Sequence, residues 1–199
     1  MPDRRTLLTV SAASLVFGTG LHTPGAANAQ DRSPQPGASP PAPPPEAAPD
    51  LPGARWSGAA RMRFFGFDVY DAALWVAPDF SASRYALFPL ALQLTYLRNL
   101  SGRSIAQRSL EEMRRGTVLT PAQEQRWLSA MQEAFPDVQS GDRITGLHQP
   151  GVGARFWFNG QPRALVRDGD FSRLFFGIWL AESSSEPGLR MALLAGAAP

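Results

Sequence analysis

The stretch that decides the fold is Gln93–Gly116, QLTYLRNLSGRSIAQRSLEEMRRG, because it begins with the pattern of a strand and ends with that of a helix. Leu94, Tyr96 and Arg98 alternate along the strand and therefore share one face. Ser101 can cap the helix that follows. A phenol and a guanidinium beside an aliphatic surface have three interpretations: catalytic groups, a clamp for an acid, or ordinary edge residues.

Three further helices are predicted after this one. Thr120 is the cap of the first, with Pro121 at its first helical position and Gln123 completing a capping box. Residues 168–180, DGDFSRLFFGIWL, place apolar side chains at i, i+3, i+4, i+7 and i+8, the spacing of an amphipathic helix. A last short helix is predicted to begin at Ser185.

The strands fall into two groups. Residues 60–76 read as one aromatic strand with a bend or bulge at Gly66. Residues 142–150 and 154–166 read as later strands, with a hairpin turn at Asn159-Gly160. Strands, two helices, strands and two helices in this order predict an α+β fold, a mostly antiparallel sheet with helices packed on one face.

The first 29 residues have the features of a signal peptide. Arg4 and Arg5 precede a mildly apolar stretch, and Ala27–Ala29 has the form that signal peptidase accepts. We expect the mature chain to begin near Gln30 and to be periplasmic or secreted in a bacterium. The paired arginines suggest the twin-arginine route, with ordinary secretion as the alternative. An uncleaved N-terminal anchor is the other interpretation; no later stretch predicts a transmembrane span.

The remaining chain divides into two parts. Residues 30–53 are rich in proline and poor in apolar side chains, which predicts a disordered tether. Residues 54–199 predict one domain, large enough for an apolar core.

Composition excludes several kinds of site. The chain has no cysteine, so disulfides, a thiolate nucleophile and cysteine-ligated metals are excluded. After signal cleavage His148 is the single histidine, and we expect it to be structural rather than catalytic or part of a metal site. All 19 basic residues are arginine and nearly balance the 17 acids, which argues against nucleic acid as a partner. We expect no cofactor.

Four blocks of sequence carry a resemblance to a known family: Ser57–Val76, Ala91–Gly116, Pro136–Gly160 and Phe171–Leu194. They resemble the chalcone isomerase-like family, especially its exported bacterial branch. The resemblance implies an open-faced β-sandwich, in which helices cover a long antiparallel sheet and a ligand cleft lies between the two layers.

The plant enzymes of this family cyclise a chalcone, and the resemblance implies which groups that reaction uses. A threonine and a tyrosine polarise the carbonyl, an asparagine completes the wall, and an arginine holds the phenolate. The first three positions fall near Phe65, Ile105 and Glu112 here, so these polar groups are replaced. We therefore expect no chalcone cyclisation and assign no catalytic residue.

The first functional hypothesis is a non-catalytic binder of a hydrophobic acid such as a fatty acid, a role that some family members have. Arg61, Arg63, Tyr96 and Arg98 are the predicted ligand-binding residues, because a guanidinium grips a carboxylate and a phenol adds a hydrogen bond. The alternative is that these arginines lie at the surface, paired with acids such as Asp68.

Two other hypotheses remain open. An isomerase with altered catalytic groups would use Tyr70, Tyr96 or Glu112 for acid–base chemistry. A protein-interaction module would instead carry a large exposed apolar patch.

Overall fold

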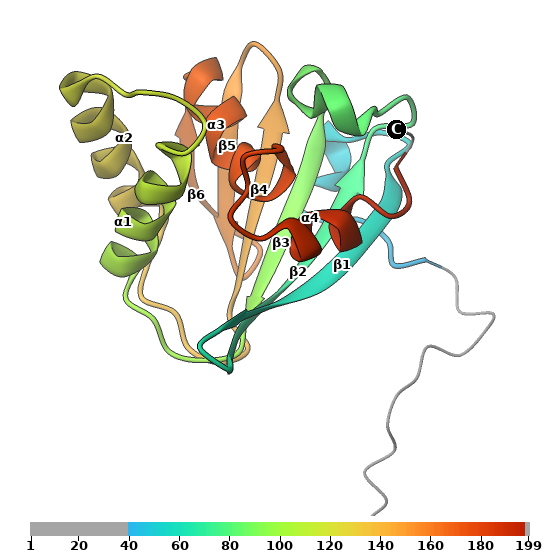
Figure 1. Cartoon of the computed structure of the whole chain (residues 1–199). Helices are drawn as coiled ribbons and strands as arrows, with labels where there is room; N and C mark the ends of the chain where they lie inside the picture. Colours follow the sequence, from blue (N-terminus) through green and yellow to red (C-terminus); the bar gives the residue numbers. More distant parts are fainter. Residues whose placement is uncertain (1–39, 198–199) are drawn as a thin grey trace, which may run out of the picture. The chain divides into compact units, whose positions relative to one another are not determined.

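Six antiparallel strands form one sheet in which every strand pairs with its neighbours in the chain (Figure 1). The computed structural model describes residues 40–197. The strands are β1 Arg55–Phe64, β2 Phe67–Val76, β3 Leu90–Tyr96, β4 Arg143–Gln149, β5 Gly153–Phe158 and β6 Gln161–Val166.

Four α-helices cover one face of this sheet (Figure 1). Helix α3 packs on β4 and β5, α2 lies beside β6, and α4 lies over β1. The α+β architecture predicted from the sequence is therefore confirmed. The helices are α1 Gly102–Met113, α2 Pro121–Ala134, α3 Gly169–Leu180 and α4 Pro187–Leu193, with short 3₁₀ helices η1 Ala48–Asp50 and η2 Ala82–Leu87.

The local signals for the starts of α1 and α2 and for the Asn159-Gly160 turn are confirmed, whereas the last helix begins at Pro187 and not at Ser185. The Ser101 hydroxyl accepts a hydrogen bond from the Ser104 amide at 3.1 Å and caps α1. Thr120 and Gln123 form the predicted capping box at the start of α2. Asn159 has φ +50° and Gly160 has φ +81°, as expected for a two-residue hairpin turn.

The main core lies between the sheet and the helices, and α3 supplies several of its aromatic rings. Phe171, Phe175 and Phe176 are buried against the aromatic and aliphatic side chains of the strands. Gly146 on β4 lets α3 come close, because a Cβ there would meet the ring of Phe176 at 3.1 Å. The predicted apolar stripe of residues 168–180 is thus the core face of α3.

The other face of the sheet is also covered, which corrects the prediction of a disordered tether. Ala47 and Leu51 pack on Trp75 and Trp157 in a second apolar cluster on that face. Central strands carry apolar side chains on both faces, and those of the outer face need a cover. Residues 30–39 of the predicted tether, like the predicted signal peptide 1–29, lie outside the described residues.

Polar contacts fix this N-terminal cover in place. The Trp75 indole donates a hydrogen bond to the carbonyl of Pro41 at 2.9 Å. Glu46 accepts a hydrogen bond from Thr145 at 2.7 Å, and Asp50 forms an ion pair with Arg155 at 2.7 Å. Residues 41–51 therefore belong to the domain that was predicted to begin at residue 54.

Residues 60–76 form a hairpin rather than the single bent strand predicted. Phe64 pairs with Phe67, and the two-residue turn consists of Phe65 with φ +47° and Gly66 with φ +79°. Turns of this kind usually carry Asn-Gly, and here phenylalanine takes the place of asparagine. The sequence therefore lacks the residue pair that would predict a two-residue hairpin turn. A bulky side chain at positive φ is also strained.

Among residues 40–197, no helix combines the length and the hydropathy that crossing a bilayer requires.

We predict that Phe65→Asn raises the free energy of unfolding by about 1 kcal/mol, because Asn-Gly accepts both positive φ angles with less strain. The change would appear as a higher urea midpoint at an unchanged denaturant slope. Phe67→Asn is the matched control, since residue 67 lies in β2 and asparagine is unfavourable in strands. An unchanged or lower midpoint for Phe65→Asn would contradict the prediction.

Candidate functional site

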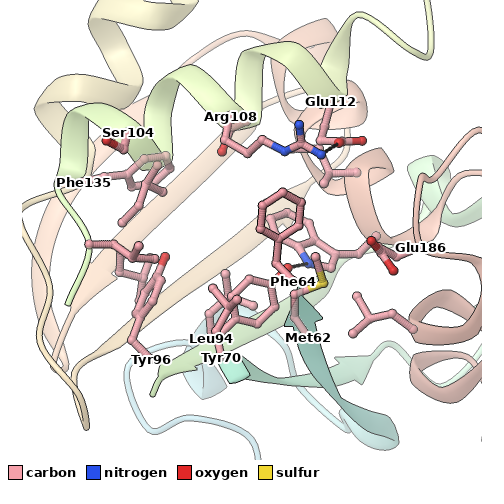
Figure 2. Close-up of a pocket in the computed structure, with 18 of the residues that line it drawn as sticks. Met62, Phe64, Tyr70, Leu94, Tyr96, Ser104, Arg108, Glu112, Phe135 and Glu186 are labelled. Atoms are coloured by element: carbon pink, nitrogen blue, oxygen red, sulfur yellow. Dashed lines mark hydrogen bonds and ion pairs between the residues drawn. The ribbon is translucent and has the colours of Figure 1, made fainter. Parts of the chain in front are cut away.

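A pocket of about 310 Å³ lies between the helix-covered face of the sheet and helices α1, α3 and α4. Strands β1 to β4 supply one wall, and the helices supply the other (Figure 2). Gly58 on β1 contributes to this arrangement, because a Cβ there would meet the carbonyl oxygen of Ala192 at 2.1 Å. The missing side chain therefore lets the end of α4 approach β1.

The pocket walls are mostly aliphatic and aromatic. Leu94 and Ile144 line it from the sheet, while Phe175, Ile178 and Trp179 line it from α3. Four of these five side chains are buried, and Ile178 is half-buried. A concave, apolar surface with a few polar groups is typical of a site for a small hydrophobic molecule.

Two tyrosines bring hydroxyl groups to this apolar surface. Trp179 donates a hydrogen bond from its indole nitrogen to the Tyr70 hydroxyl at 3.0 Å. The Tyr96 hydroxyl has no hydrogen-bond partner in the part of the chain that the structure describes, although Tyr96 is 2% exposed. Because Tyr96 lines the pocket, its hydroxyl can donate a hydrogen bond to an acceptor atom of a ligand there.

Burial keeps both phenols protonated. It raises the pKa of Tyr70 to about 12, with the nearby carboxylates of Glu186 and Glu112 adding to the shift. Burial also raises the pKa of Tyr96, and its neighbour Tyr70 adds to the effect. At neutral pH these groups act as hydrogen-bond donors, and neither has the lowered pKa that would favour a general base.

A charged pair on α1 forms the opposite edge of the pocket. Arg108 donates a hydrogen bond to Oε1 of Glu112, and its other nitrogen lies 3.3 Å from Glu111. Glu112 has an 8% exposed side chain, and its Oε2 is buried without a hydrogen bond, 3.7 Å from Arg115. Arg108 is therefore already neutralised by acids of its own helix.

Two of the predicted ligand-binding residues line the pocket. Tyr96 ends β3, and Arg98 follows two residues later on the same side. The Arg98 guanidinium lies over the Phe67 ring at 5.3 Å and has no carboxylate partner among residues 40–197. Tyr96 and Arg98 thus bring together a donor without a partner and a cation without a counter-ion.

Arg61 and Arg63 lie away from the pocket, which corrects their predicted place beside the ligand. Met62 and Phe64 of β1 line the pocket, so Arg61 and Arg63, which alternate with them, point to the opposite face. Arg61 and Arg63 instead form the surface ion pairs that were the alternative interpretation, because both bind Asp68, at 3.0 and 2.7 Å.

The geometry of these ion pairs leaves little capacity for a ligand. Arg61 donates two further hydrogen bonds to the carboxylate of Asp71, at 2.7 and 2.9 Å. These contacts raise the pKa of Arg61, and the hydrogen bond from Arg63 is the main cause that lowers the pKa of Asp68.

Of the three positions that align with the plant catalytic groups, two lie at the pocket and one does not. Ile105 and Glu112 do line the pocket, as the alignment implies. Phe65 does not, because it sits in the β1–β2 turn and is 86% exposed. Arg108 was not predicted as part of the site. Its signal was the i, i+4 spacing to Glu112 on the helix that follows β3.

His148 has the structural role expected from the sequence. Its ring nitrogens lie 2.6 Å from the Ser172 hydroxyl and 3.0 Å from the carbonyl of Ala86. Both His148 and Ser172 are buried in the core, and neither lines the pocket. Ser172 also donates a hydrogen bond to the carbonyl of Gly153 at 2.9 Å, so this pair ties α3 to the sheet.

Comparison with known proteins supplies a family and a fold. The family model described as chalcone isomerase-like matches residues 55–195. An uncharacterized protein of Haemophilus influenzae is 29% identical over 145 residues, which are 72% of this chain and 70% of that protein.

A solved structure shows a similar fold. It is the crystal structure of a fatty-acid binding protein of Arabidopsis thaliana, with a TM-score of 0.56 and 15% sequence identity. The match covers 71% of this chain and 86% of that one. At this identity the likeness establishes the arrangement of sheet and helices.

We predict that no tyrosine ionises at the ordinary pKa of about 10 while the protein is folded, since burial also raises the pKa of Tyr85, the third tyrosine. The stability that these groups contribute is complete below pH 10 and is lost as the pH rises through their folded values. Tyrosinate absorbance should therefore rise together with loss of circular dichroism. A phenol that titrates near pH 10 in a still-folded protein would contradict this.

Proposed function

The chain belongs to the chalcone isomerase-like family, and from that premise we propose that it is a non-catalytic binder of a hydrophobic acid, such as a fatty acid. The observation that carries the proposal is an apolar pocket with two donors at one edge, the Tyr96 hydroxyl and the Arg98 guanidinium, neither of which is held by a protein acceptor among residues 40–197. A long-chain acid has the matching form, an anionic head on an apolar chain.

The head group would bind at Tyr96 and Arg98. A carboxylate that enters an apolar site must replace its water, and a charged hydrogen bond from a guanidinium offsets that loss. Arg98 has no carboxylate of its own within residues 40–197, whereas Arg108 is held by Glu111 and Glu112. The Tyr96 hydroxyl supplies a second donor.

The acids of the pocket support one orientation of the ligand. Figure 2 shows Tyr96 on one side of the pocket, with Glu112 and Glu186 on the other. An anionic head would be repelled by those carboxylates and drawn toward Arg98, so the apolar chain would extend past Leu94 toward Trp179. The side chains of α3 would then cover it.

Three observations favour binding over isomerisation. The two pocket tyrosines keep their protons well above neutral pH. Ile105, which lines the pocket, stands where the plant enzymes are expected to have their catalytic tyrosine. A donor aimed at a developing oxyanion contributes roughly 3–4 kcal/mol, which an isoleucine cannot supply. The similar structure from Arabidopsis thaliana is of a protein described as fatty-acid binding, which supports the same direction.

We further propose that binding takes place in the periplasm, because the sequence begins with the features of an export signal.

A module for protein interaction is the competing function. Native mass spectrometry of protein purified from its own host separates the two, since a binder would carry a small hydrophobic molecule.

For ligand binding we predict that Arg98→Ala weakens the affinity of delipidated protein for a long-chain acid by about tenfold, because one charged hydrogen bond is lost near the solvent. Tyr96→Phe should cost severalfold. The corresponding alcohol should bind Arg98→Ala and wild type alike. Isothermal calorimetry measures each affinity.

Arg63→Ala is the matched control, since Arg63 is exposed on the opposite face of β1 and should not affect binding. If Arg98→Ala and Arg63→Ala bind the acid with equal affinity, the carboxylate site is wrong. Conversion of a chalcone at enzyme-like rates would favour the isomerase instead.

For export we predict that protein recovered from the periplasm starts at or near Gln30, after the Ala27–Ala29 site. Intact-mass measurement gives the N-terminus directly. A mature protein that retains Met1 would contradict both the cleavage and the periplasmic location.

A further inference from the structure

The tip of the β1–β2 hairpin, Phe64 to Phe67, carries an unusual surface. Phe64 is 50%, Phe65 86% and Phe67 63% exposed, so three aromatic rings of one short turn stand in solvent. Single exposed apolar residues are ordinary, but a contiguous aromatic group on a projecting turn indicates contact with an apolar partner. We propose that this hairpin tip docks the protein on the surface of a lipid bilayer.

The backbone at the tip does not favour an aromatic side chain at residue 65. Phe65 holds φ +47°, a conformation that suits asparagine or glycine and strains a bulky residue. Its ring packs edge-to-face with the Phe64 ring, at 4.5 Å between centroids, and it belongs to neither apolar core of the described residues. The side chain therefore contributes an exposed apolar surface rather than packing.

The charges near the tip suit an anionic lipid surface. The hairpin's two carboxylates, Asp68 and Asp71, are both held by Arg61 or Arg63. Arg98 lies over the Phe67 ring without an acid partner in the described range, so this cluster carries one net positive charge. An arginine such as Arg98, beside a shallowly inserted aromatic group, can reach a lipid phosphate with its guanidinium.

The size of the surface favours lipid over protein. The three rings together expose the equivalent of about two phenylalanine side chains, on the order of 400 Å². A stable protein interface buries about 800 Å² on each partner, and the tip is a narrow projection rather than a face. A bilayer needs no complementary shape and accepts aromatic side chains at the level of the head groups.

The tip is continuous with the pocket. Phe64 lines the pocket and is 50% exposed. Met62, the next residue on the same face of β1 away from the tip, also lines the pocket. A docked tip would bring the mouth of the pocket to the lipid, so that a hydrophobic acid passes between them with little exposure to water. This passage rests on the proposed function, whereas the docking does not.

The test is cosedimentation of the mature protein with vesicles of phosphatidylethanolamine and phosphatidylglycerol. Wild type should sediment with them and should bind phosphatidylcholine vesicles less, because those lack anionic lipid. Phe65→Asn and Phe67→Ser should each lower the partition coefficient by about tenfold, the loss expected for one aromatic side chain. Leu87→Ser is the matched control.

Leu87 is 64% exposed, as Phe67 is, but it belongs to η2 at the other end of the sheet (Figure 1). Its replacement should leave vesicle binding within about twofold of wild type. The proposal is overturned if wild type remains in the supernatant, or if the tip variants sediment as wild type does. A wild-type dimer in sedimentation velocity that Phe65→Asn abolishes would also overturn it, by assigning the tip to a second copy.

Fatty-acid binding measured without vesicles separates docking from the proposed function. Phe65 does not line the pocket, so Phe65→Asn should bind the acid as wild type does. Phe67→Ser is left out of this comparison, because the Phe67 ring lies under the Arg98 guanidinium. Loss of vesicle binding with intact acid binding supports docking. Wild-type vesicle binding in a protein that binds no acid would reject the proposed function and leave docking in place.

Discussion

The packing of helix α3 on the sheet is the interaction on which the rest of the structure depends. One side chain of that helix, Phe175, contacts five aromatic rings at centroid distances of 5.1 to 5.8 Å: Phe135, Phe156, Phe171, Phe176 and Trp179. The same helix then presents Ile178 and Trp179 to the pocket. Aromatic rings are rigid, whereas flexible aliphatic side chains could fold into the space beside them. The aromatic packing that fills the core around Phe175 therefore also keeps the adjacent pocket open.

Signals within a few residues predicted much of this fold. The caps at Ser101 and Thr120, the Asn159-Gly160 turn and the spacing along 168–180 each act locally, so the sequence alone identifies them. The hairpin around Phe65 was missed, because its conformation is supported by strand pairing rather than by the residue's own preference. Tertiary contacts override local propensity at that point.

The site was predictable only in part, because it depends on which face of each strand meets the helices. Tyr96 and Arg98 were predicted and line the pocket, whereas Arg61 and Arg63 were also predicted to bind the ligand and lie on the other face of β1. Alternation groups residues by face, but a shift of one residue exchanges the two faces. Arg108 was missed for a similar reason, since its place depends on how α1 rotates over the sheet.

The N-terminal cover has a consequence for the order in which the chain can fold. Ala47 and Leu51 are synthesised early. Their polar neighbours Glu46 and Asp50, however, bind Thr145 on β4 and Arg155 on β5, which follow them in the chain by 99 and 105 positions. The tryptophan face of the sheet therefore stays open until most of the domain exists. A fragment that begins at residue 55, where the match to the family model begins, would lack this cover permanently. Trp75 and Trp157 would then be exposed to solvent and would favour aggregation.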